Sequence, residues 1–180
     1  MLKKILLIVL MFAGFQANAA IINVSTGLIE GSGELEGATG VNVLGSLYDV
    51  SFVGGSCISS FSGCDSNSDF TFDHAGAVAA SEALVSQVFG GAFDGSVYDM
   101  SPATVHGILD PTGGNFMTAY NLHLLSGTPV VSLAGAFNVA SGFPDVTVCT
   151  GFNECGFVLN SDVDTLDNIT FAKWTKAQAV

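Results

Sequence analysis

The sequence contains no arginine and only 4 lysines, against 16 aspartates and glutamates. Lys3 and Lys4 lie near the amino terminus, so residues 20–180 keep two lysines and a formal charge of −14. Binding to nucleic acid or to an anionic membrane needs clustered cations that neutralise phosphates. We therefore expect no nucleic-acid partner and no attraction to an anionic membrane surface.

Common catalytic motifs are also missing. The sequence has no G-x-S-x-G, H-E-x-x-H, S-x-x-K or phosphate-cradling G-x-x-x-x-G-K motif. Glu34 and Glu36 could share one strand face as an acid and base pair, but they lie in a polar GSGELEG stretch and better serve solubility. One Trp and three Tyr are few for a sugar-cleaving cleft. We therefore expect a protein without catalytic residues.

No apolar run reaches the roughly 20 residues that span a bilayer. The longest one near the start, Ile5 to Phe15, follows Lys3 and Lys4 and precedes the small-x-small site Ala17-Asn18-Ala19, an order typical of an export signal. We predict a signal peptide over residues 1–19 and a single secreted β-rich domain over residues 20–180. We expect an extracellular location, with the periplasm as the alternative, and no membrane association after cleavage.

Four cysteines form two local pairs, Cys57 with Cys64 and Cys149 with Cys155. Structural zinc sites usually place two to four residues between paired ligands, whereas these pairs enclose six and five. An exported chain also meets oxidising conditions. We predict two sequential disulfides, each closing a short turn that contains Gly or Ser.

Alternation of apolar and polar residues recurs through residues 20–180 and predicts strands with one buried face. In 47–53, Tyr48, Val50 and Phe52 lie on one side, and we expect this strand to pair with 40–44 across Gly45-Ser46. Further short strands are expected over 69–72, 116–125, 130–137, 146–149, 155–159 and 168–174. The predicted fold class is mainly β, a β-sandwich-like antiparallel domain.

One segment, about residues 75–89, has helical periodicity instead. Its apolar arc comprises Ala77, Val78, Ala80, Leu84, Val85, Val88 and Phe89, with Glu82, Ser86 and Gln87 opposite. Asp73 can cap its start and Gly90-Gly91 can end it. We predict one amphipathic helix covering the β-rich core.

The best candidate metal site lies between the first cysteine pair and this helix. Asp65, Asn67 and Asp69 place three side-chain oxygens on alternate residues, and Asp73 follows. Such oxygens suit a hard cation such as calcium, although an EF-hand is excluded because Phe70 and Gly76 stand where Gly and Glu are needed. Two interpretations stay open, a calcium loop and a polar turn. Asp162, Asp164 and Asp167 form a second acidic cluster with the same alternatives.

The three histidines give no clear site. His123 falls on the polar side of an expected strand, His74 at the helix start and His106 after Pro102. A solvated surface role is the default for each.

The stretch GATGVNVLGSLYDVSFVGGSCISSFSGCDSNSDFTF, with the helix AVAASEALVSQVF after it, resembles a group of uncharacterised exported bacterial proteins of the PEP-CTERM-associated type. The resemblance covers about a third of residues 20–180 and implies secretion by a Gram-negative bacterium. It implies no activity and no catalytic residues. The C-terminal sorting tail of such proteins is not found after Trp174, so we expect no anchoring of that kind.

These observations favour an exported, non-catalytic domain that binds or serves structure at the cell surface or in the extracellular matrix. The expected partner is an extracellular polysaccharide or a surface protein. Two alternatives stay open, a secreted hydrolase whose site is assembled from distant residues and a self-assembling extracellular subunit.

Overall fold

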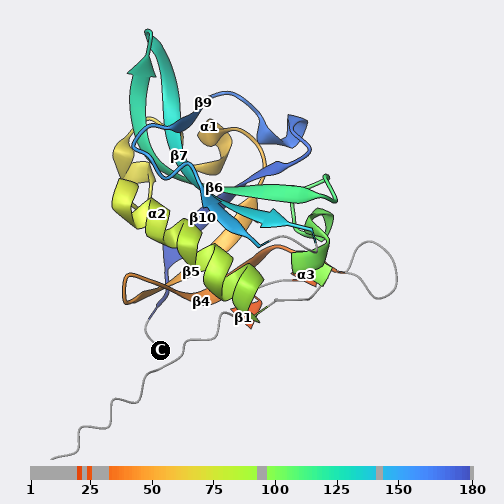
Figure 1. Ribbon diagram of the computed structural model, residues 1–180. Coiled ribbons are helices and arrows are strands. Elements are labelled where there is room, and N and C mark those ends of the chain that lie inside the picture. The colour runs from red at the N-terminus through yellow and green to blue at the C-terminus, as the bar shows by residue number, and fades with distance from the viewer. Residues whose placement is uncertain (1–19, 22–23, 26–32, 93–96, 141–143, 179–180) are drawn as a thin grey trace, which may run out of the picture.

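A computed structural model of the chain describes residues 20–21, 24–25, 33–92, 97–140 and 144–178 (Figure 1). The predicted signal peptide, residues 1–19, lies outside the described residues. No helix in the described part is long and apolar enough to cross a membrane.

The described strands form one large sheet and one small sheet. Across the eight-stranded sheet the order is β1 (Ala20–Ile21), β4 (Gly37–Val43), β5 (Ser46–Val53), β10 (Ile169–Lys176), β6 (Gly113–Leu125), β7 (Thr128–Val139) and β8 (Val146–Val148), with β9 (Cys155–Val158) also paired to β7. β2 (Val24–Ser25) and β3 (Glu34–Leu35) form a separate pair.

The mainly β class is confirmed. The strands build a curled mixed sheet, so a sandwich is not confirmed, and the pairing of β10 with β6 is parallel where antiparallel strands were expected. The carboxyl-terminal strand β10 inserts between β5 and β6, which are distant from it in sequence. Local alternation carries no information on such an insertion.

Two hairpins are closed by two-residue turns. β4 and β5 pair as expected, but the turn residues are Leu44 and Gly45, one position earlier than predicted. Ser126 and Gly127 join β6 to β7 in the same way. All four residues have positive φ, between 51° and 85°, as a type I′ turn requires. Glycine at the second position adopts this conformation without steric cost.

The expected helix is present, though its bounds differ. α2 (His74–Ala83) continues as a π-helical segment η2 (Leu84–Ala92), so Gly90 and Gly91 do not end it. Asp73 is the N-cap and its Oδ1 accepts the backbone N–H of Gly76 at 2.9 Å. The other described helical segments are short: α1 (Cys57–Ser60), η1 (Asn67–Asp69), α3 (Val97–Met100), η3 (Pro102–Thr104) and η4 (Val163–Thr165).

The strand expected over 69–72 is wrong. The Ser66 side chain caps the start of η1, and the Asp69 carboxylate accepts the backbone N–H of Ser66. The two residues thus form a capping box at a turn of the chain. Phe70 is buried just after this turn. Polar residues that bond their own backbone here outweigh the short apolar alternation.

Both faces of the sheet are covered. Phe116 and Ala172 pack with Leu84, Val88 and Phe89 of the long helix, and the neighbouring residues Met117 and Phe171 pack in a second cluster. That second cluster contains the Cys57–Cys64 disulfide, Phe61 and Phe70. Because consecutive strand residues point to opposite faces, the helix covers one face and the disulfide-bearing segment covers the other.

Candidate functional site

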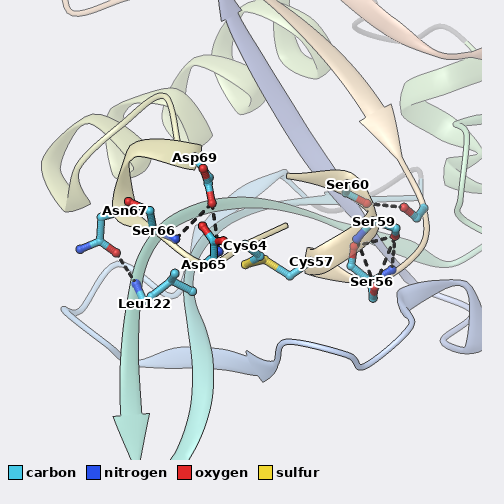
Figure 2. Close-up of a disulfide and its surroundings, with 11 residues drawn as sticks. Ser56, Cys57, Ser59, Ser60, Cys64, Asp65, Ser66, Asn67, Asp69 and Leu122 are labelled. Carbon is cyan, nitrogen blue, oxygen red and sulfur yellow. Dashed lines mark hydrogen bonds between the residues drawn. A yellow bond between two sulfur atoms is a disulfide. The ribbon is translucent and has the colours of Figure 1, made fainter. Parts of the chain in front are cut away.

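Three of the four residues in the predicted calcium loop already bond to the backbone. Asp69 Oδ2 accepts the N–H groups of Asp65 and Ser66 at 3.0 and 3.1 Å (Figure 2). Asn67 Oδ1 accepts the N–H of Leu122 in β6 at 2.7 Å, and Asp73 caps α2. The Asp65 side chain is exposed.

The structure therefore gives this segment a local role as a series of caps and a link to β6. Within the described ranges, no group of three or more His, Cys, Asp or Glu side chains is placed to share a cation. Calcium binding by Asp65, Asn67, Asp69 and Asp73 stays a prediction.

Both predicted disulfides are confirmed, with Cys57 joined to Cys64 and Cys149 to Cys155. Cys57 and Cys64 are fully buried, whereas Cys149 and Cys155 are half-buried. The first disulfide directly precedes the capped segment 65–73. The second closes a loop whose tip carries Phe152.

A β-bulge brings these two loops to one place on β6. In the β6–β7 ladder, Ala119 pairs with Leu133 and Asn121 pairs with Ser132, which leaves Tyr120 as the extra residue. Consecutive strand residues normally point to opposite faces, but a bulge re-aims its side chains. Tyr120 and Asn121 accordingly line the same pocket.

That pocket has a volume of about 330 Å³ and is assembled from three segments. Its lining comprises Asn67, residues 70–74, Tyr120, Asn121 and Phe152. Asn67, Thr71, Asp73 and Phe152 are exposed at its rim, whereas Phe70 and Tyr120 are buried. The pocket is thus an open hollow between the start of α2, the bulge and the loop closed by the second disulfide.

Three rings of the lining contact one another. The His74 ring lies 5.0 Å from that of Tyr120 and 5.4 Å from that of Phe152, centroid to centroid, and it is nearly perpendicular to Phe152 at 88°. The Phe152 side chain is 66% exposed. His74 Nε2 donates to the carbonyl oxygen of Thr150 at 3.0 Å, because a carbonyl oxygen can only accept.

Two further lining residues, Asn67 and Asn121, belong to a chain of hydrogen-bonded amides. Asn67 Nδ2 donates to Asn121 Oδ1 at 3.0 Å, and Asn121 Nδ2 donates to Asn153 Oδ1 at 3.3 Å. The Asn153 backbone N–H donates to the Tyr120 hydroxyl at 2.7 Å. These bonds link the capped segment, the bulge and the disulfide loop, so the lining amides are held in fixed orientations.

Within the described residues, Ser132 Oγ lies 3.0 Å from His123 Nδ1, a pairing that resembles a nucleophile and its base. The single hydroxyl proton of Ser132 goes to Asn153 Oδ1 at 2.7 Å, so His123 is the donor in this pair. Ser132 is also 0% exposed. This arrangement opposes nucleophilic attack by Ser132, which would need a free proton acceptor and access to substrate.

His106 and Glu34 are joined elsewhere, where His106 Nδ1 lies 3.2 Å from Glu34 Oε2 in a half-exposed contact. Glu34 is therefore paired with a histidine and not with Glu36. The default surface role of His106 is refined to a link between β3 and the loop before β6.

Sequence reasoning missed Tyr120, Asn121, Phe152 and Asn153 as site residues, and it treated His74 as an ordinary polar residue. No local signal marks the bulge, since no Gly or Pro interrupts the strand around Tyr120. Of the predicted metal residues, only Asn67 and Asp73 line the pocket.

Comparison of the chain with known protein families, with curated proteins and with solved structures finds no match. The resemblance to PEP-CTERM-associated proteins stays a prediction.

Proposed function

We propose that this protein is an exported, non-catalytic domain that binds a component of the cell surface or of the extracellular matrix through the hollow beside Tyr120. The observation that carries this proposal is the pairing of an exposed aromatic ring, Phe152, with hydrogen-bonded amides in one open pocket. Binding sites commonly combine an apolar lining with a few fixed polar groups.

The pocket is supported from three directions, which favours a site over an accidental hollow. One disulfide holds the Phe152 loop, a helix cap holds Asp73, and a bulge holds Tyr120 and Asn121. Fixing the binding groups in advance lowers the entropic cost of binding. Disulfides are also typical of proteins that work outside the cytoplasm.

The alternative of a self-assembling subunit needs a free strand edge. β1 pairs with β4 only at Ala38 and Thr39, so β4 has no strand beside it at Asn42. There the amide of Gln87 accepts the N–H of Asn42 at 2.9 Å and donates to its carbonyl oxygen at 2.7 Å. This side chain occupies the hydrogen-bonding positions that an added strand would use at Asn42. The binding proposal is therefore preferred to assembly through this edge.

The proposal is tested on the secreted protein itself. Labelled wild-type protein is incubated with washed cells of the strain that secretes it, and the retained fraction is measured. Phe152→Ala should reduce retention about tenfold, because it removes one aromatic contact worth on the order of 1 kcal/mol together with its buried area.

Leu109→Ala is the matched control, because Leu109 is 68% exposed, close to the 66% of Phe152, and lies outside the pocket. It should be retained like the wild type. Equal retention of Phe152→Ala and wild type would overturn the assignment of the pocket as the binding site.

A further inference from the structure

The two ring walls of the pocket favour a ligand with a flat apolar face. Phe152 and His74 meet almost at a right angle, and the Tyr120 ring lies 5.0 Å from His74 and 6.2 Å from Phe152, centroid to centroid. The Phe152 side chain is 66% exposed, so much of its ring is accessible to a ligand. The ring face carries partial negative charge, so it attracts C–H groups that carry partial positive charge. The axial C–H groups of a sugar ring form such a face.

The polar groups of the pocket include both donors and acceptors. Asn67 and Asn121 each use one Nδ2–H in the amide chain, which leaves the second N–H of each for a ligand. Asp73 uses Oδ1 in capping α2, and within the described residues its Oδ2 has no hydrogen bond. A ligand whose groups donate and accept at once satisfies both kinds, and hydroxyl groups do so.

Charge and hydrogen bonding disfavour two other classes of ligand, anions and quaternary ammonium ions. Asp73 is the charged residue in the described lining, and the two described lysines, Lys173 and Lys176, are both in β10 outside the pocket. An anionic ligand would meet an acidic protein without a cation to pair with. A quaternary ammonium would suit the rings and Asp73, but it has no acceptor for the amide donors, which would lose their bonds to water.

The size of the pocket limits how much ligand it takes. Its volume of about 330 Å³ is near the lower end of the range of about 300–1,000 Å³ occupied by ligand sites. Because the rim is exposed, the units on either side of a bound sugar can continue into solvent.

We infer that the pocket binds one neutral sugar unit of an extracellular polysaccharide, stacked on Phe152 and hydrogen-bonded to Asn67, Asn121 and Asp73. This inference rests on the proposed binding function and adds the class of its ligand.

The experiment separates the ligand class from the binding function. Washed cells are treated with periodate, which cleaves the vicinal diols of sugars, or with protease, and retention of wild-type protein is then measured. The deproteinised polysaccharide released from the same cells serves as the soluble probe, with binding followed by retardation in native gels that contain it. Wild type, Phe152→Ala, Phe152→Trp and Leu109→Ala are compared.

Periodate should abolish retention and protease should not. The polysaccharide should retard wild type and Leu109→Ala, while Phe152→Ala should bind about tenfold more weakly and Phe152→Trp should recover binding. If protease-treated cells no longer retain the protein and periodate-treated cells still do, the sugar inference is overturned and a protein ligand is indicated. The weaker retention of Phe152→Ala would then still assign the pocket as the binding site. Retention of Phe152→Ala at the wild-type level would overturn the proposed function itself.

Discussion

The two disulfides should contribute unequally to stability although their rings are almost equal in size. The sequence separations are 7 for Cys57–Cys64 and 6 for Cys149–Cys155. Chain entropy alone then gives about 2.4 kcal/mol for the first bridge and about 2.2 kcal/mol for the second. On this basis, removing either one would cost nearly the same free energy of unfolding.

The two disulfides differ in burial, and this makes their contributions to stability unequal. Cys57 is 1% exposed and Cys64 is 0% exposed, and both pack in the cluster with Phe61 and Phe171. Replacing the pair by alanine removes two buried sulfur atoms, which costs about 2 kcal/mol more if each behaves like a buried methylene with its cavity. The half-buried pair Cys149–Cys155 escapes most of this cost.

We therefore expect Cys57→Ala/Cys64→Ala to lose about 4–5 kcal/mol and Cys149→Ala/Cys155→Ala to lose about 2–3 kcal/mol. A domain of this size typically has 5–15 kcal/mol, so the second variant should remain folded. Urea unfolding without reductant measures both losses, and the melting temperatures should differ by about 4–8 °C. Equal losses in the two variants would refute the burial argument.

Four further predictions follow from single features. Thr118→Val should lower the free energy of unfolding by about 1–3 kcal/mol, because the buried Trp174 Nε1–H donates to Thr118 Oγ1 at 3.0 Å and would lose its acceptor; urea unfolding at the wild-type midpoint would contradict this. The side-chain and backbone hydrogen bonds from Thr112 hold the pKa of Asp110 below its ordinary value. The stability that these bonds contribute is present above the pKa of the unfolded chain and is lost as pH falls through the pKa of the folded protein. Thr112→Val should raise the pKa of Asp110 in an NMR titration, and an unchanged pKa would show that the side-chain bond is not the cause. The calcium interpretation of Asp65, Asn67, Asp69 and Asp73 predicts that calcium at a hundred times its dissociation constant raises the free energy of unfolding of wild type by about 2.7 kcal/mol and that of Asp65→Ala/Asp69→Ala not at all. Equal unfolding midpoints of wild type in calcium, magnesium and chelator would contradict it and favour the interpretation as a polar turn. The signal prediction requires the secreted protein to begin at Ala20, the first residue of β1, and an intact mass that includes residues 1–19 would contradict it.

Several features were predictable because they depend on residues close together in the chain. Cys57 is close to Cys64 in the chain, and Cys149 is close to Cys155, so sequential pairing closes two short loops. Asp73 directly precedes the helix, at the position where an N-cap is needed. The helical period of residues 75–89 and the alternation in 47–53 report the face that each element buries. Each of these signals is read within about one element of structure.

The tertiary structure alone decided how the elements meet. β10 inserts between β5 and β6 through pairings that join residues more than 50 positions apart, such as Ile169 with Asn115. The extra residue at Tyr120 follows from the register of β6 on β7, which no Gly or Pro marks in the sequence. The pocket needs that bulge, the capped start of α2 and the Phe152 loop at one point. Contacts between segments far apart in the chain, such as Asn67 with Leu122 and His74 with Thr150, placed them there, and a local residue pattern does not encode such contacts.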